Sequence, residues 1–148
     1  MKQFETYLRH LQTYLRGEAV PFDEIELPDE VAPTVSHLGL ADEPEESRIT
    51  WLDGREKKVP VEVAVSGPLA IKVAARHADR IMFTLGADVD RIAWGINVAK
   101  QARRDAGLDP GGIAFGAYIN CVPGNEMDLA RDLARGGLAT FEIGRAHV

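Results

Sequence analysis

The stretch Val61-Glu-Val-Ala-Val-Ser-Gly-Pro68 decides the fold of this chain. Valines alternate with other residues up to Ser66, which is the pattern of a β-strand with one buried face. Gly67-Pro68 then ends the strand, and proline is favoured in the first turn of a helix, where its missing N–H costs nothing. The sequence therefore predicts a strand over 61–66 that is followed directly by a helix over 68–78.

The same order of elements continues towards the C-terminus. We expect strands over 80–85 and within 113–122, a helix over 89–106 between them, and a further helix from Glu126 to about Gly136. Asp88 is a suitable N-cap for the helix over 89–106, and Gly107 suits the position just beyond its end. Such alternation predicts right-handed βαβ units on a parallel sheet. Three units cannot close a (β/α)8 barrel, so the periodicity alone fits either part of a barrel or a doubly wound sheet.

The N-terminal part of the chain is less regular. Apolar residues at three- and four-residue steps predict a helix over 3–16, with Gly17 as its stop. Residues 18–58 form an irregular insertion, whose first thirty residues contain four prolines and many acidic residues. Within it, we expect a short strand over 48–52 and then a turn at Asp53-Gly54, as a hairpin arm that enters the next strand.

The composition excludes several classes of protein. The 148 residues suffice for one domain, and the net charge of −6 argues against a nucleic-acid-binding face. The single cysteine, Cys121, rules out a disulfide framework and fits a reducing cytoplasm; we expect it to be a small buried residue. No apolar run has the length of a membrane span. No metal site is expected, because His10, His37 and His77 have no partners at metal-ligand spacing.

Several motifs in fixed order resemble one family. They are the strand and turn of residues 59–68, the apolar helix ending in Ala78-Asp79, the strand end Phe83-Thr-Leu-Gly86, and Ala106-Gly-Leu-Asp-Pro110. Together with the opening helix, they make residues 3–17 and 59–141 similar to the luciferase-like monooxygenases. Within that family the chain looks most like the deazaflavin-dependent branch that includes methylenetetrahydromethanopterin reductase-like enzymes.

The resemblance implies an α/β fold, a partial (β/α)8 TIM barrel comprising its middle to C-terminal portion. The family's first strands would precede Met1, so residues 1–141 would be an incomplete barrel domain that is inactive and poorly soluble alone. The intact protein would be a cytoplasmic, homo-oligomeric oxidoreductase that uses coenzyme F420 or FMN. It would transfer a hydride to a small organic substrate, or activate oxygen.

The resemblance also implies a cofactor-binding site at Ser66, Gly67, Pro68, Thr84 and Gly86. The residues agree with this, because the ends of parallel strands share one edge and a helix start attracts anions. The alternative is an ordinary strand-to-helix turn. A basic residue that often follows the second glycine is replaced by Ala87-Asp88, which leaves F420 and FMN both open. It also leaves open a non-catalytic barrel-like module that binds a cofactor or a partner.

Other candidate residues point to packing. Trp51 and Trp94 fit packing better than cofactor stacking, and Asp79 fits a cap or turn better than an acid catalyst. No P-loop, carboxylate pair or Ser-His-Asp order is present, and the catalytic residues stay unknown. Cofactor-driven hydride transfer does not need them.

Residues 142–148, Glu-Ile-Gly-Arg-Ala-His-Val, match the translation of a common short-read sequencing adapter, whose next codon is a stop. We therefore expect these seven residues to be adapter read-through that is not native to the protein. Resequencing of the source locus tests this, since a genomic stop codon without adapter sequence would contradict it.

Overall fold

The computed structural model describes residues 1–25, 31, 37, 39, 44–54 and 57–143, and the side chains of 138–143 are not among the features described. The chain divides into two compact units, Met1–Val61 and Glu62–Val148, and each is considered by itself. Part of the predicted insertion over 18–58 and the last five residues of the predicted adapter segment lie outside the described residues.

The first unit is built around helix α1 (Lys2–Leu15), which confirms the helix predicted over 3–16. Gly17 follows it with φ of 78°, and a Cβ there would lie 2.8 Å from the carbonyl oxygen of Leu52. Only glycine fits this position without strain, because both the backbone angle and the close neighbour exclude a side chain. Leu8 on α1 and Val20 are buried in this unit.

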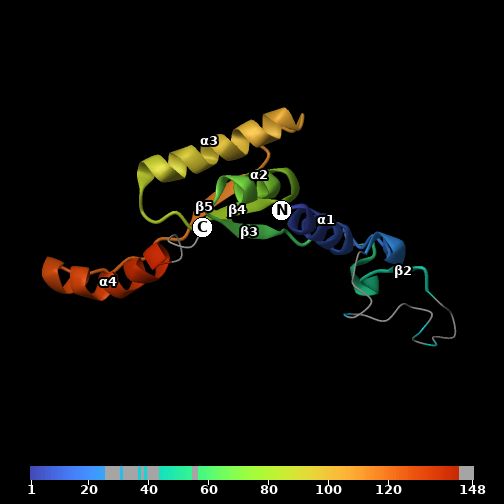
Figure 1. The fold of residues 1–148 in the computed structure, drawn as a ribbon, viewed down its shortest axis with the longest axis horizontal. Coiled ribbons are helices and arrows are strands. Elements are labelled where there is room, and N and C mark those ends of the chain that lie inside the picture. The colour runs from blue at the N-terminus through green and yellow to red at the C-terminus, as the bar shows by residue number, and fades with distance from the viewer. Residues whose placement is uncertain (26–30, 32–36, 38, 40–43, 55–56, 144–148) are drawn as a thin grey trace. The chain divides into compact units, whose positions relative to one another are not determined.

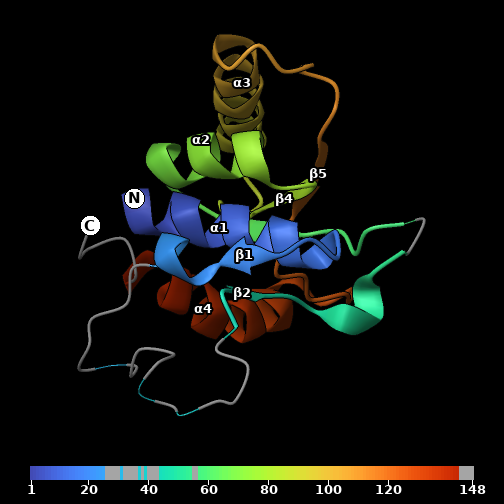
Figure 2. The ribbon, with the colours of Figure 1, turned by 90° about the vertical axis from the view of Figure 1, so that its right-hand side faces the viewer.

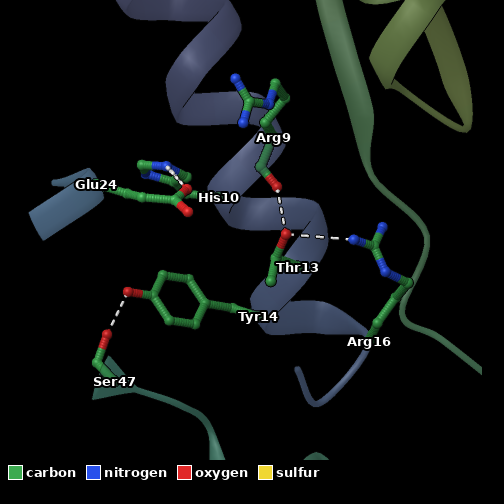
Figure 3. A network of polar contacts seen from close by, with 7 residues as sticks. All are labelled: Arg9, His10, Thr13, Tyr14, Arg16, Glu24 and Ser47. Carbon is green, nitrogen blue, oxygen red and sulfur yellow. Dashed lines mark hydrogen bonds and ion pairs between the residues drawn. The ribbon is translucent and has the colours of Figure 1, made fainter. Parts of the chain in front are cut away.

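Two short strands, β1 (Val20–Pro21) and β2 (Glu46–Ser47), pair antiparallel in the first unit. Tyr14 of α1 shares a hydrogen bond with Ser47 of β2, and His10 faces Glu24 of the 3-10 helix η1 (Phe22–Glu24) (Figure 3). These contacts join α1 to the nearby η1 and to β2, which is distant from it in sequence.

The strand predicted over 48–52 is wrong. Residues Thr50–Leu52 form a 3-10 helix, η3, and β2 ends at Ser47 before that stretch begins. The turn at Asp53-Gly54 is present, with Gly54 at φ of 69°, but β2 pairs with β1 and makes no hairpin with the next strand. Four consecutive apolar or β-branched residues did not suffice for a strand: in the 3-10 turn Leu52 is buried while Trp51 stays 74% exposed.

The second unit holds a parallel sheet of three strands in the order β3 (Glu62–Val65), β4 (Arg80–Phe83) and β5 (Ala114–Ala117). Both neighbouring pairs run parallel. This confirms the strands predicted over 61–66, 80–85 and within 113–122, each in a shorter form.

The connecting helices are α2 (Pro68–His77) and α3 (Val89–Asp105), which lie close to their predicted bounds. Both lie on the same side of the sheet (Figures 1 and 2). Consecutive units of a barrel have this arrangement, and so does one half of a doubly wound sheet. Within the described residues the unit is thus a parallel α/β sheet with both crossover helices on one side, and no closed barrel is present.

The core of the second unit lies between the sheet and these two helices. Val63, Val65, Ile81 and Phe83 alternate with exposed or half-buried residues, so one face of each strand carries the buried side chains. Phe83 stacks on Phe115 with ring centroids 5.8 Å apart. Gly95 brings α3 close to this layer, because a Cβ there would lie 2.9 Å from the Phe83 ring.

A buried arginine fastens α2 to the segment that follows α3. Arg103 donates a hydrogen bond of 2.8 Å from Nη1 to the carbonyl oxygen of Ala75 and one of 2.6 Å from Nε to that of Asp109. Ala75 lies in the last turn of α2, where carbonyl groups lack partners within the helix. The guanidinium therefore satisfies one of them.

The last helix, α4 (Met127–Ile143), begins close to the predicted Glu126 and ends well beyond the predicted Gly136. Its final two residues fall inside the segment predicted to be adapter read-through, whose origin stays a prediction. Cys121 precedes this helix and is exposed, so the expectation of a buried cysteine is wrong. It lies beyond the end of β5, where the chain leaves the sheet and no longer packs under α2 and α3.

Candidate functional site

The five residues predicted to bind a cofactor lie at one edge of the parallel sheet. Val65, the last residue of β3, pairs with Phe83, the last residue of β4, so Ser66 and Thr84 follow side by side. The backbone N–H of Thr84 donates a 2.9 Å hydrogen bond to the carbonyl oxygen of Val65. The predicted convergence of these strand ends beside the start of α2 is thus present in the fold.

The start of α2 has no side-chain cap. Gly67 is its N-cap with φ of −98° and ψ of 153°, Pro68 occupies the first turn, and no side chain accepts from the N–H groups there. Those groups and the helix dipole give a local positive potential. Ser66 is exposed beside them, and within the described part of the chain its hydroxyl has no hydrogen-bond partner. This corner is therefore open to an anionic group.

The glycine at position 67 has no structural explanation within the described residues. Its φ of −98° is open to any residue, and a Cβ built there would meet nothing within 4 Å. At Gly86, by contrast, φ of 79° requires glycine although the space around it is also empty. Gly86 thus serves the turn after β4, whereas neither the backbone angle nor the described neighbours require glycine at position 67.

Thr84 is already engaged within the fold. Its Oγ1 donates a 3.2 Å hydrogen bond to the carbonyl oxygen of Val65, the same oxygen that accepts from its backbone N–H. The side chain is half-buried, and the bond ties the ends of β3 and β4 together. Thr84 can still accept a hydrogen bond, but donation to a ligand would require this contact to break.

The start of α3 lies at the same edge and is different in charge. Asp88 is its N-cap, as predicted, and its carboxylate accepts from the N–H groups of Asp90 at 3.0 Å and Arg91 at 3.1 Å. Asp90 adds a second carboxylate to the first turn. An anion is therefore favoured at the start of α2 and disfavoured at the start of α3.

Tyr118 is a further residue of this edge, which the sequence alone did not single out. Its backbone N–H donates a 2.8 Å hydrogen bond to the carbonyl oxygen of Phe83, so it follows β5 as Thr84 follows β4. Ser66, Thr84 and Tyr118 then stand side by side; we call these three residues the rim row. All three carry hydroxyl groups, and Tyr118 is 54% exposed.

The rim row belongs to the face of the sheet that α2 and α3 leave uncovered. Successive residues of a strand point to opposite faces, and Val65 and Phe83 point to the helices. On the other face, below the rim row, Gly116 lies against Met82, since a Cβ there would be 3.0 Å from the Met82 Cε. Below these, Arg80 forms an ion pair with Glu62 at 3.4 Å. The face thus changes from charged to apolar to hydroxyl-bearing towards the edge.

Other features of the described residues add no second site. They contain no group of three or more His, Cys, Asp or Glu side chains that could hold a metal ion. Among them, no helix is both long and apolar enough to cross a membrane. The exposed Trp51 and Trp94 leave their predicted packing role unsupported, since they are 74% and 42% exposed.

Parallel βα units with an open anion corner at the carboxyl edge define an α/β protein whose corner lies where such folds bind their ligands. The family model for luciferase-like monooxygenases matches residues 3–147, and the chain belongs to that family. A search of curated proteins found no match. The family consists in general of enzymes of the TIM-barrel fold that are flavin- or F420-dependent oxidoreductases.

Proposed function

We propose that the intact protein is a flavin- or F420-dependent oxidoreductase whose cofactor phosphate binds at Ser66, Gly67 and Pro68. Its reaction would be hydride transfer to a small organic substrate, or oxygen activation. Within the family, we propose that it belongs to the methylenetetrahydromethanopterin reductase-like branch. The observation that carries this proposal is Gly67, where neither the backbone angle nor any described neighbour requires the lack of a side chain. A phosphate that approaches the backbone closely would require it.

The uncapped start of α2 and the Ser66 hydroxyl supply the donors for such a phosphate. The N–H groups of Leu69 and Ala70 belong to the first turn, and Pro68 removes the N–H that would have no role. Hydrogen bonds to a charged acceptor are stronger than neutral ones, and each contributes about 1.5–3 kcal/mol. Thr84 and Gly86 would hold the neighbouring strand end in place, through the hydroxyl bond to Val65 and the turn after β4.

The redox chemistry would come from the cofactor when bound, and the residues described here would bind and orient it. The carboxylates of Asp88 and Asp90 would repel a phosphate from the start of α3, so the phosphate is expected at the start of α2. Both F420 and FMN carry phosphate, and the corner at α2 suits either. We further propose that the intact protein is cytoplasmic and forms a homo-oligomer.

A cofactor titration of the intact protein tests the site. Ser66→Ala removes a donor and should weaken affinity for FMN or F420 about tenfold, since ~1.4 kcal/mol is one decade. Gly67→Ala should weaken it at least as much, although the added Cβ meets no atom of the described chain. Turnover at saturating cofactor should change less than affinity, because the phosphate is remote from the atom that transfers the hydride.

The matched control is Gly136→Ala, which places a Cβ in equally empty space on α4. It should leave cofactor affinity unchanged. If Ser66→Ala and Gly67→Ala both bind cofactor like the native protein, the Ser-Gly-Pro turn is only a structural corner and the proposed site is wrong.

The second candidate is a non-catalytic module that binds a cofactor or a partner. It is favoured by Ala87-Asp88, which places a carboxylate at the α3 start where a basic residue often stands in the family. A protein that binds a yellow cofactor stoichiometrically but shows no reduction of it by any hydride donor would support this candidate. Reduction and reoxidation of the bound cofactor would exclude it.

A further inference from the structure

Tyr118 is the one member of the rim row that neither the motif nor the anion corner explains. Its backbone continues the β4–β5 ladder, and its side chain is 54% exposed. Because the backbone makes the hydrogen bond to Phe83, a shorter side chain at position 118 keeps that bond. Such a residue can be tested for a binding role without loss of the fold.

The spacing of the rim row sets the size of ligand that could contact both of its ends. Neighbouring strands lie about 4.8 Å apart, so the backbones of Ser66 and Tyr118, two strands apart, are separated by about 10 Å. A phosphate group is much smaller than this. Only an extended ligand, anchored at one end by its phosphate, can contact both residues.

We propose that the cofactor lies across the carboxyl edge from β3 towards β5, with its flat ring system against the Tyr118 ring. This rests on the proposed function, which places the phosphate at Ser66 and Gly67. Charge gives the direction, because Asp88 and Asp90 occupy the α3 start on the helix side of β4 and oppose the anionic end there. The uncovered face, with Met82 and Gly116 below the rim row, leaves the apolar side of the ligand facing apolar atoms.

Aromatic contact is the interaction that the Tyr118 side chain offers at this position. Stacking of a conjugated ring on an aromatic side chain depends on the π-face and not on the hydroxyl. Tyr118→Phe should therefore keep the affinity for the cofactor, whereas Tyr118→Ala should weaken it about tenfold. Tyr118 is in this view a positioning residue, which fixes where the ring end of the ligand lies.

The experiment compares two probes in the intact protein. The first is whichever of FMN and F420 the protein binds, titrated by absorbance; the second is inorganic phosphate, measured as a competitor of that cofactor. Tyr118→Ala should weaken the affinity for the cofactor and leave the inhibition constant of phosphate unchanged. Ser66→Ala should weaken both, because it acts at the phosphate end. Tyr7→Ala, which removes a tyrosine of similar exposure (60%) from α1, is the matched control.

The outcomes separate this inference from the function on which it rests. If Ser66→Ala weakens binding but Tyr118→Ala does not, the phosphate site stands and the placement of the ring is overturned. The ring contact is also overturned if Tyr118→Phe loses as much affinity as Tyr118→Ala, or if Tyr118→Ala weakens phosphate equally. If Ser66→Ala changes neither constant, the phosphate site itself fails, whatever Tyr118 does.

Discussion

Helices α2 and α3 begin at the same edge of the sheet, one strand apart, and they begin in opposite ways. The α3 start carries a carboxylate cap from Asp88 that accepts two backbone N–H groups. The α2 start carries Gly67, which offers no cap at all. A capped start stabilises its own helix, and an uncapped one keeps its N–H groups for a ligand. The comparison therefore separates a start used for stability from one available for binding.

The largest effect on the free energy of unfolding is expected in the buried layer between the sheet and the two helices. Phe83 is fully buried, stacks on Phe115 and lies under Gly95 of α3. Phe83→Ala should lower the free energy of unfolding of the intact protein by about 3–5 kcal/mol, as large cavities in cores do. Urea denaturation followed by circular dichroism measures this. A loss below about 1 kcal/mol would mean that the helices do not depend on this common layer, and the comparison of their starts would lose its basis.

An intermediate effect is expected at the capped start. Asp88→Ala leaves the N–H groups of Asp90 and Arg91 without their acceptor and should cost about 1 kcal/mol of unfolding free energy. Ser66→Ala, the matched change beside the other helix start, should stay within about 0.5 kcal/mol, since Ser66 is exposed. Equal losses in the two variants, measured by the same denaturation, would show that the two starts do not differ in this way.

The smallest change in stability comes from giving α2 the cap that α3 has. Gly67→Asp should alter the free energy of unfolding by only a few tenths of a kcal/mol, because glycine and aspartate differ little at an N-cap. Its carboxylate would nevertheless occupy the proposed phosphate position and repel the cofactor, so affinity should fall at least tenfold. Gly67→Asn supplies a cap without the charge and should lose less affinity. Native-like cofactor binding by Gly67→Asp would contradict the proposed role of the α2 start.

The sheet unit was predictable because its signals are local. Alternating valines, Gly67-Pro68 and the Asp88 cap each specify a boundary within a few residues, and the structure has those boundaries. The stretch over 48–52 offered only composition, and a 3-10 turn that buries Leu52 prevailed over strand propensity. Local residues alone could not place the strand. It lies just before this stretch, at Glu46–Ser47, because those residues pair with Val20-Pro21, which are distant in the sequence.

The site was predictable in part for the same reason. Ser66, Gly67 and Pro68 are consecutive, so their proximity to the α2 start follows from the sequence itself. Tyr118 belongs beside Thr84 only because β5 pairs with β4 in one particular register. A shift by one residue would turn Tyr118 to the other face, and nothing near residue 118 specifies that register. The hydroxyl bond from Thr84 to Val65 was hidden for a similar reason, since it joins two strands.

The two bonds of Arg103 have a consequence for motion. They hold the C-terminal turn of α2 through the carbonyl of Ala75, while no side chain of the described residues caps its opposite end at Gly67. Local unfolding of this helix should therefore start at its first turn, and amide hydrogen exchange should be faster at Leu69 and Ala70 than at the amides of the last turn. A phosphate bound at the first turn would slow amide exchange in that turn alone. Occupancy of the site would therefore be visible as slower exchange at one end of the helix.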